Sequence, residues 1–184
     1  RVEFSCHGFD KLTITNPQNN TWSNTSINGF YFNVSDNTGI ENCTLLLNGA
    51  PDQSTPGSQI TLNEISNITA TIAEGIYNWS ITCYDNTTWH SQNTSTNRTI
   101  FIDLTKPSVT LVSPVDSANF TTRNANLNIT ATDNMANQTT CNITLDGYIV
   151  RSGIVANNSY LNYSANNFTE GTHYWNATCT DYAN

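Results

Sequence analysis

The sequence predicts an all-β chain made of two similar β-sandwiches in tandem. Apolar and polar residues alternate in many short segments, as in Leu127-Asn128-Ile129-Thr130, and no stretch has helical spacing. Gly, Asn, Asp and Pro separate these segments, which is the pattern of strands and turns in a sandwich. The chain also matches itself at an offset of 96 to 98 residues, which suits one compact domain per copy.

The predicted strands follow one another in the same order in both copies. The copies therefore share one strand plan. The matched segments are Leu12 to Pro17 with Val109 to Pro114, Phe30 to Asp36 with Leu127 to Asp133, Asn42-Cys43-Thr44 with Thr140-Cys141-Asn142, and Tyr77 to Asp85 with His173 to Asp181; a turn dipeptide, Asn48-Gly49 or Asp146-Gly147, follows the third pair.

The two ends of the sequence break this plan. Arg98 to Asp103 is predicted to be the last strand of the first sandwich, which gives domains at residues 10–104 and 105–184. Arg98 to Pro114 and Arg1 to Pro17 are both 17 residues, so residues 1–9 are predicted to hold a similar strand. The counterpart of Trp89 to Asp103 does not occur in the second copy. The second sandwich is therefore expected to lack its last strand.

A sandwich that lacks a strand exposes unpaired edge groups and part of its core. A neighbouring copy can complete it by donor-strand complementation, a form of β-strand addition. Donor and acceptor belong to opposite ends of the chain, so the contact is head-to-tail and generates a filament of identical subunits. The predicted donor strand consists of Arg1, Val2, Glu3, Phe4, Ser5 and Cys6.

The phase of the donor is a difficulty for this prediction. Val2, Phe4 and Cys6 align with Thr99, Phe101 and Asp103, which alternation places on the outer face. A shift of one residue would be needed to bury the apolar side of the donor, because such a shift exchanges the two faces of a strand.

An alternative interpretation keeps the same fold. The sequence also suits a segment of a longer tandem-repeat protein, such as a surface-layer, stalk or adhesin glycoprotein. Trp22 and Trp89 lie outside the core phase and would suit stacking on sugars, which makes a carbohydrate-binding role part of this alternative.

Cysteine positions predict two disulfides. Cys83 and Cys179 share a strand phase with Trp79 and Trp175, and the first cysteine of each copy shares its phase with core leucines and isoleucines. The predicted pairs are Cys43 with Cys83 and Cys141 with Cys179; the alternative is two buried reduced thiols in each domain. Cys6 is left over, and suits either an intersubunit disulfide or a small buried apolar residue. Five cysteines suit an oxidising, extracellular compartment.

Seventeen Asn-x-Ser/Thr triplets predict a heavily N-glycosylated protein. Within alternating segments the asparagines fall on the polar phase, where they face solvent. The alternative is that these are ordinary polar residues of exposed strand faces. The predicted acceptors are Asn19, Asn24, Asn33, Asn42, Asn67, Asn78, Asn86, Asn93, Asn97, Asn119, Asn128, Asn137, Asn142, Asn157, Asn162, Asn167 and Asn176.

Composition argues against several functions. The net charge is −8 with only six Lys and Arg, so nucleic acid is not an expected partner. No apolar run is long enough to span a bilayer. His7, His90 and His173 are isolated, and no Gly-x-Ser-x-Gly turn occurs, so the chain is not expected to be an enzyme. Covalent glycans are the only predicted attached groups, apart from a weak calcium prediction described below.

Three segments carry a resemblance to a known group. Ile102 to Leu111 resembles the linker and first strand of tandem immunoglobulin-like repeats in prokaryotic surface proteins, and Ala131 to Asn134 and Cys179 to Asp181 resemble the ends of their B and F strands. The resemblance covers almost the whole chain and implies two immunoglobulin-like Greek-key sandwiches at the cell surface. Together with the dense acceptor triplets, it suggests an archaeal surface glycoprotein.

The immunoglobulin-like arrangement would bring the B–C and F–G loops and the interdomain linker to one pole. Asp103, Asp133 and Asp181 would then gather at the junction, where hard oxygen ligands suit calcium. The competing explanation is that aspartates at strand ends bond to nearby backbone groups.

Overall fold

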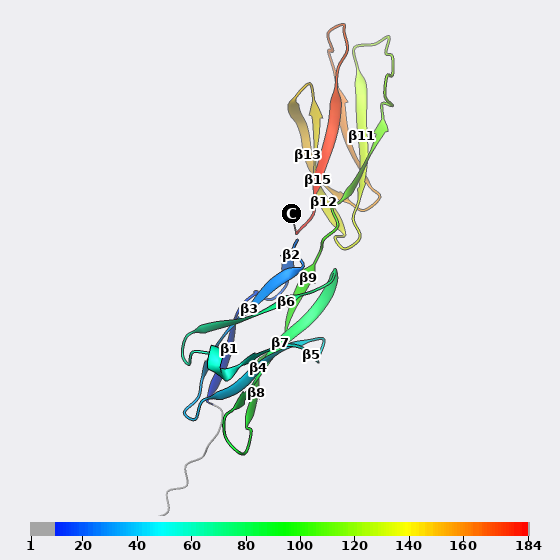
Figure 1. The fold of residues 1–184 in the computed structure, drawn as a ribbon. Coiled ribbons are helices and arrows are strands. Elements are labelled where there is room, and N and C mark those ends of the chain that lie inside the picture. The colour runs from blue at the N-terminus through cyan, green and yellow to red at the C-terminus, as the bar shows by residue number, and fades with distance from the viewer. Residues whose placement is uncertain (1–9, 184) are drawn as a thin grey trace, which may run out of the picture. The chain divides into compact units, whose positions relative to one another are not determined.

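The structure is a computed structural model that describes residues 10–183 (Figure 1). The chain forms two compact units that divide between Leu104 and Thr105. In the described residues, every regular element is a β-strand except the short 3₁₀ helix η1 (Gly57–Gln59). The predicted all-β fold with two tandem sandwiches is confirmed. The predicted donor strand, Arg1 to Cys6, lies outside the described residues.

The first unit contains two sheets, in which every pair of strands except β2 with β9 is antiparallel. One has the order β1-β3-β6, and the other has the order β2-β9-β7-β4-β5, with β8 paired to β7. The parallel pairing of β2 with β9 was not predicted from the sequence. The strands are β1 (Lys11–Asn16), β2 (Thr21–Ser23), β3 (Ile27–Ser35), β4 (Ile40–Leu47), β5 (Ala50–Pro56), β6 (Ile65–Thr71), β7 (Gly75–Asp85), β8 (Gln92–Thr94) and β9 (Arg98–Ile102).

The second unit repeats this plan with fewer strands. Its sheets have the orders β10-β11-β14 and β13-β12-β15. In the part of this unit that the structure describes, no strand corresponds to β8 or β9. The strands are β10 (Ser108–Ser113), β11 (Ala125–Thr132), β12 (Gln138–Leu145), β13 (Tyr148–Ala156), β14 (Tyr160–Ala165) and β15 (Trp175–Thr180).

Turn residues place the central hairpin of each unit. Asn48 and Gly49 connect β4 to β5 with φ angles of 51° and 80°, and Asp146 and Gly147 connect β12 to β13 with φ angles of 50° and 86°. In each turn both residues have a positive φ angle, as a two-residue type I′ turn requires. Asn-Gly and Asp-Gly are the pairs that adopt these angles most readily.

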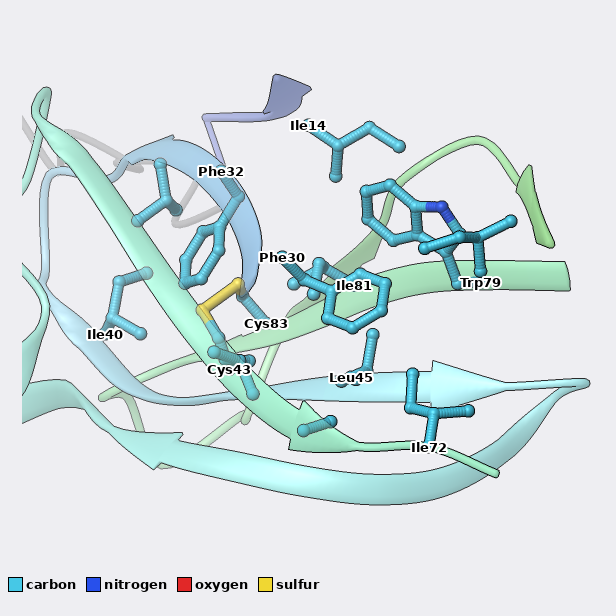
Figure 2. Close-up of a cluster of buried hydrophobic side chains, with 14 of the residues drawn as sticks. Ile14, Phe30, Phe32, Ile40, Cys43, Leu45, Ile72, Trp79, Ile81 and Cys83 are labelled. Carbon is cyan, nitrogen blue, oxygen red and sulfur yellow. A yellow bond between two sulfur atoms is a disulfide. The ribbon is translucent and has the colours of Figure 1, made fainter. Parts of the chain in front are cut away.

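The core of the first unit lies between its two sheets. Every second residue of β3 is buried, because alternate side chains of a strand point to opposite faces. Figure 2 shows Phe30, Phe32 and Leu45 around the disulfide of Cys43 and Cys83. The corresponding cluster of the second unit contains Leu127, Ile129, Cys141, Ile143 and Val155, among others.

The two predicted disulfides are present in the structure. Cys43 bonds to Cys83 and Cys141 bonds to Cys179, across sequence separations of 40 and 38 residues. In both units the two cysteines are directly opposite each other on neighbouring antiparallel strands.

Asp103 differs from the expectation based on alternation. It follows directly after β9 and was expected on the outer face, but it is 0% exposed. Its backbone N–H donates to the carbonyl of Ser23 at 2.9 Å. The strand ends at Ile102, so the strict two-residue period no longer applies to the residue that follows.

Candidate functional site

In the first unit, β9 completes the sheet. It pairs antiparallel with β7 from Gly75↔Ile102 to Trp79↔Arg98. On its other side it pairs with β2. Ile100 and Ile102 of β9 are fully buried, so this strand supplies core side chains as well as backbone hydrogen bonds.

In the second unit, β15 corresponds to β7. Leu145↔Trp175 repeats the pair Leu47↔Trp79. Among the described residues, β15 pairs only with β12 and therefore forms one edge of its sheet. The backbone groups on the other side of β15 have no neighbouring strand there, which is the geometry that strand addition uses.

The side chains of β15 are less well covered than those of β7. Trp79 is 1% exposed and Ile81 is fully buried, whereas Trp175 and Ala177 are only part-buried. A similar difference appears on the first strand of each unit, because Leu111 is 45% exposed and its counterpart Ile14 is 5% exposed. We call the outer side of β15, together with Leu111 and Val112 of β10, the open edge.

One ionic contact lies beside the open edge. Nδ1 of His173 lies 2.7 Å from Oδ2 of Asp146, and its Nε2 lies 3.1 Å from the carbonyl oxygen of Thr169. The other carboxylate oxygen of Asp146 accepts a hydrogen bond from the N–H of Tyr174 at 2.9 Å. These contacts connect the turn after β12 to the residues that lead into β15.

This contact shifts both pKa values. The hydrogen bond to Asp146, with a further one to the Thr169 carbonyl, raises the pKa of His173 above 6.5. The hydrogen bond from His173, with that from the Tyr174 N–H, lowers the pKa of Asp146 below 3.8.

We predict that this pair stabilises the second unit most between about pH 4 and 6.5, the usual pKa values of the two groups. The stabilisation that His173 provides is fully present below the pKa of histidine in the unfolded chain. It is lost as the pH rises through the higher pKa that His173 has in the folded protein. The contribution of Asp146 is complete above its unfolded pKa and disappears as the pH falls through the lower folded value. Urea unfolding from pH 3 to pH 9, followed by circular dichroism, measures this profile. In His173→Gln, the free energy of unfolding of the second unit should no longer fall as the pH rises above about 6.5. The same fall in the variant as in the original protein would contradict the prediction.

The predicted glycan acceptors all reach the surface. None of the seventeen asparagines belongs to the buried class, including those within strands. Several of them accept hydrogen bonds through the side-chain oxygen: Asn19 from the N–H of Thr99 at 2.7 Å, Asn78 from the hydroxyl of Thr99 at 3.1 Å, and Asn142 from the hydroxyl of Ser152 at 2.7 Å. A glycan is attached to the amide nitrogen, so these contacts are compatible with glycosylation.

Asn157 differs from the other acceptors because both ends of its amide are engaged. Its Oδ1 accepts from the N–H of Asp133 at 3.0 Å, and its Nδ2 donates to the carbonyls of Asp133 and Ala136 at 2.9 and 3.0 Å. A backbone N–H on one side and two carbonyls on the other leave no freedom to exchange the amide oxygen and nitrogen. The side chain therefore joins the end of β13 to the loop after β11.

We predict that Asn157 carries no glycan in the folded protein. Attachment would replace one of the two donated N–H groups, and a buried carbonyl that loses its donor costs about 1–3 kcal/mol. Glycopeptide mass spectrometry of the native protein measures occupancy at each asparagine. Asn162 of β14 is the matched control, since it is exposed and also precedes a serine at the third position. Occupancy at Asn157 equal to that at Asn162 would contradict this prediction.

The three calcium candidates belong to different units. Asp133 and Asp181 are in the second unit, and their nearest carboxylate oxygens lie within 4.8 Å of each other. Asp133 Oδ1 also accepts from the N–H groups of Met135 and Ala136 at 2.9 and 2.6 Å, which is the loop-bracing role expected of an aspartate at a strand end. Asp103 belongs to the first unit, so a calcium site that combines the three stays a prediction.

The aromatic residues of the carbohydrate-binding alternative have different surroundings. The ring of Trp22 stacks on Phe101 at a centroid distance of 4.4 Å and an interplanar angle of 8°. Trp89 is 84% exposed in the loop between β7 and β8. Stacking occupies one face of Trp22, so Trp89 is the better placed of the two for an external sugar.

Other candidate groups remain apart in the structure. His90 contacts Glu41 at 2.8 Å, while His173 contacts Asp146, so these two histidines belong to separate exposed pairs. Cys6 and His7 lie outside the described residues. Among residues 10–183, no helix is long and apolar enough to cross a membrane.

Comparisons with known proteins support the fold. No protein family and no curated protein matches the sequence. Among solved structures, the fibronectin(III)-like modules of Clostridium thermocellum CbhA are 17% identical, with 94% of this chain and 87% of that chain covered and a TM-score of 0.50. A chimeric titin Z1Z2 tandem is 13% identical over 94% of this chain and 93% of that chain, with a TM-score of 0.34. The first similarity supports a β-sandwich fold of the immunoglobulin-like and fibronectin(III)-like kind. It does not extend to an archaeal origin.

Proposed function

We propose that this chain is the structural subunit of an extracellular filament, polymerised head-to-tail by donor-strand complementation. The segment Arg1 to Cys6 of one copy is added to the next beside Trp175 and the residues that lead into β15, in the position that β9 has beside Gly75 to Trp79 in the first unit. The observation that carries the proposal is the contrast between β7, paired on both sides, and β15, paired on one side in the described residues. The filament is heavily N-glycosylated and serves adhesion or cell–cell contact at the surface, which the resemblance implies to be archaeal.

Strand addition would improve both the backbone and the core of the second unit. The added strand would exchange backbone hydrogen bonds with the residues from Gly171 to Trp175, which correspond to the β9-paired residues Gly75 to Trp79. It would also cover Trp175 and Leu111, and complete burial of a large apolar side chain contributes about 1.5–3 kcal/mol. In the first unit, β9 itself contributes the fully buried Ile100 and Ile102 to the core.

The surface of the subunit is consistent with an extracellular polymer. All seventeen acceptor asparagines are at least part-exposed, and two disulfides are present. Only 11% of the residues are charged, so glycans and neutral polar groups would provide most of the solubility.

The test is deletion of residues 1–6 from the full chain. The complete protein should form thin unbranched filaments in negative-stain electron microscopy, and the deletion variant should remain monomeric in size-exclusion chromatography. A synthetic peptide of residues 1–9 should bind the deletion variant and protect the amide hydrogens of residues 171–175 from exchange. A peptide of the same composition in scrambled order is the control.

Two outcomes would overturn the proposal. Filaments that persist after deletion would show that another surface joins the subunits. A complete chain that stays monomeric and ignores the peptide would favour the alternative, in which the missing strand follows in the same, longer polypeptide. In that case, saturable binding of glycans by the monomer, lost in Trp89→Ala, would indicate the carbohydrate-binding role.

A further inference from the structure

Arg98 of β9 makes the most extensive side-chain contact between the last and first strands of the first unit. One terminal guanidinium nitrogen donates to the carbonyls of Thr15 and Pro17 at 3.1 and 2.7 Å, and the other donates to the carbonyl of Ile14 at 2.9 Å. The guanidinium carbon lies 5.9 Å from the centroid of the Trp79 ring. A planar cation with a fork of donors matches these three oxygens and the aromatic face.

The carbonyls come together because β1 ends irregularly. The pairing of β1 with β3 shifts between Ile14 and Asn16. Beside this bulge the carbonyls of Ile14, Thr15 and Pro17 accept hydrogen bonds from the guanidinium of β9. We call the three carbonyls and the ring of Trp79 the guanidinium site of the first unit.

The second unit repeats the construction at every step. The pairing of β10 with β11 shifts between Leu111 and Ser113. Trp175 is opposite Leu145, as Trp79 is opposite Leu47. The corresponding elements of this second guanidinium site are the carbonyls of Leu111, Val112 and Pro114 and the ring of Trp175.

We propose that the second unit binds an arginine side chain at this site, and that the occupant is Arg1 of a second copy. Arg1 precedes Pro17 by the same number of residues as Arg98 precedes Pro114, so the two arginines hold the same place in the repeat. This inference rests on the proposed strand addition and adds the register in which the strand enters.

The register follows from the pairing in the first unit. There, Arg98 is opposite Trp79, Thr99 is opposite Asn78, and Ile100 is opposite Tyr77. With Arg1 opposite Trp175, Val2 is opposite Tyr174 and Glu3 is opposite His173. The apolar pair of the first unit, Ile100 with Tyr77, thus becomes an acid with an imidazole in the second.

This register resolves the difficulty over the phase of the donor. Arg1 and Glu3 point inward. Arg1 meets the backbone carbonyls there, and the carboxylate of Glu3 lies beside the cationic form of the His173 ring, whose two nitrogens keep their contacts with Asp146 and the Thr169 carbonyl. The part-buried imidazole then lies between two acids. Val2 points outward beside Tyr174, which is 76% exposed and offers an apolar surface. The alternative register, shifted by one residue, buries Val2 and Phe4 but removes Arg1 from the carbonyls.

Disulfide cross-linking distinguishes the two registers in the full chain. In a Cys6→Ser background, we expect Val2→Cys with Tyr174→Cys to give a ladder of covalent multimers after mild oxidation. Val2→Cys with His173→Cys and Phe4→Cys with His173→Cys report the two shifted registers, because neighbouring residues of a strand point to opposite faces. Multimers from either shifted pair, without those from Val2 and Tyr174, would overturn the register. Absence of any polymer would instead refute the strand addition on which it rests.

Removal of the cation tests the site itself. Arg1→Gln should raise the subunit concentration at which filaments half dissociate by at least about tenfold, because several charge-assisted hydrogen bonds are lost. Arg1→Lys should be almost as impaired, since an ammonium does not offer a planar fork of donors. Arg151→Gln, at an exposed position of β13, is the matched control and should have no effect. Filaments of Arg1→Gln as stable as those of the control would overturn the guanidinium site.

Discussion

Trp79→Ala is expected to lower the free energy of unfolding of the first unit by about 3–5 kcal/mol. The indole is 1% exposed, and its ring makes an edge contact with Phe30 at a centroid distance of 4.9 Å. It also lies beneath the guanidinium of Arg98. Replacement by alanine therefore leaves a cavity in a closed core and removes one wall of the guanidinium site.

Trp175→Ala is the matched control in the second unit. Its ring is only part-buried in the single chain, so we expect a smaller loss in monomeric protein than for Trp79→Ala. Hydrogen-exchange mass spectrometry resolves the two units and gives the opening free energy of β3 and β11 separately. A loss for Trp175→Ala in the monomer equal to that for Trp79→Ala would contradict the view that the open edge leaves this core incomplete. In the polymer, the two losses should become similar.

The second prediction concerns the disulfides. Replacement of Cys43 and Cys83 by alanine should destabilise the first unit by about 4 kcal/mol, because an unfolded loop of this length gains that much chain entropy when the cross-link is removed. The separation of the two cysteines is 40 residues. Urea unfolding monitored by hydrogen exchange in each unit measures the loss.

The cysteine pair of the second unit provides the comparison. Cys141 and Cys179 are separated by 38 residues, so the loop-closure contribution should be nearly the same. Each double variant should affect its own unit and leave the other unchanged, because the two disulfides lie in separate compact units. A loss below about 1 kcal/mol for either pair would show that the unfolded chain keeps these strands together without the bond.

Much of the fold was predictable because strands repeat every two residues. This period placed Trp79 and Cys83 on one face of β7, and it placed the acceptor Asn78 on the other. The internal repeat then transferred each assignment to the second copy, so both disulfide pairs followed from phase alone. The pairing of β15 on one side only, among the described residues, agrees with a comparison of the copies, because no counterpart of β9 occurs within residues 105–184.

Contacts between distant segments were not predictable from period or repeat. Asn157 belongs to an acceptor triplet like the others, but its amide bonds to Asp133 and Ala136, more than twenty residues earlier. Arg98 reads as an ordinary polar residue at the start of a strand, yet it bonds to carbonyls at the end of β1. Burial of Asp103 likewise depends on its contact with Ser23.

The amino-acid sequence alone was sufficient for the all-β class, the duplication, the cysteine pairs and the exposed phase of the acceptor asparagines. These features depend on local alternation and on the similarity of the two copies. The folded chain was needed to locate the guanidinium site, to separate Asn157 from the other acceptors and to pair His173 with Asp146. Each of these depends on hydrogen-bond directions between segments that meet only after the sheets have packed, and such directions leave no periodic trace in a sequence.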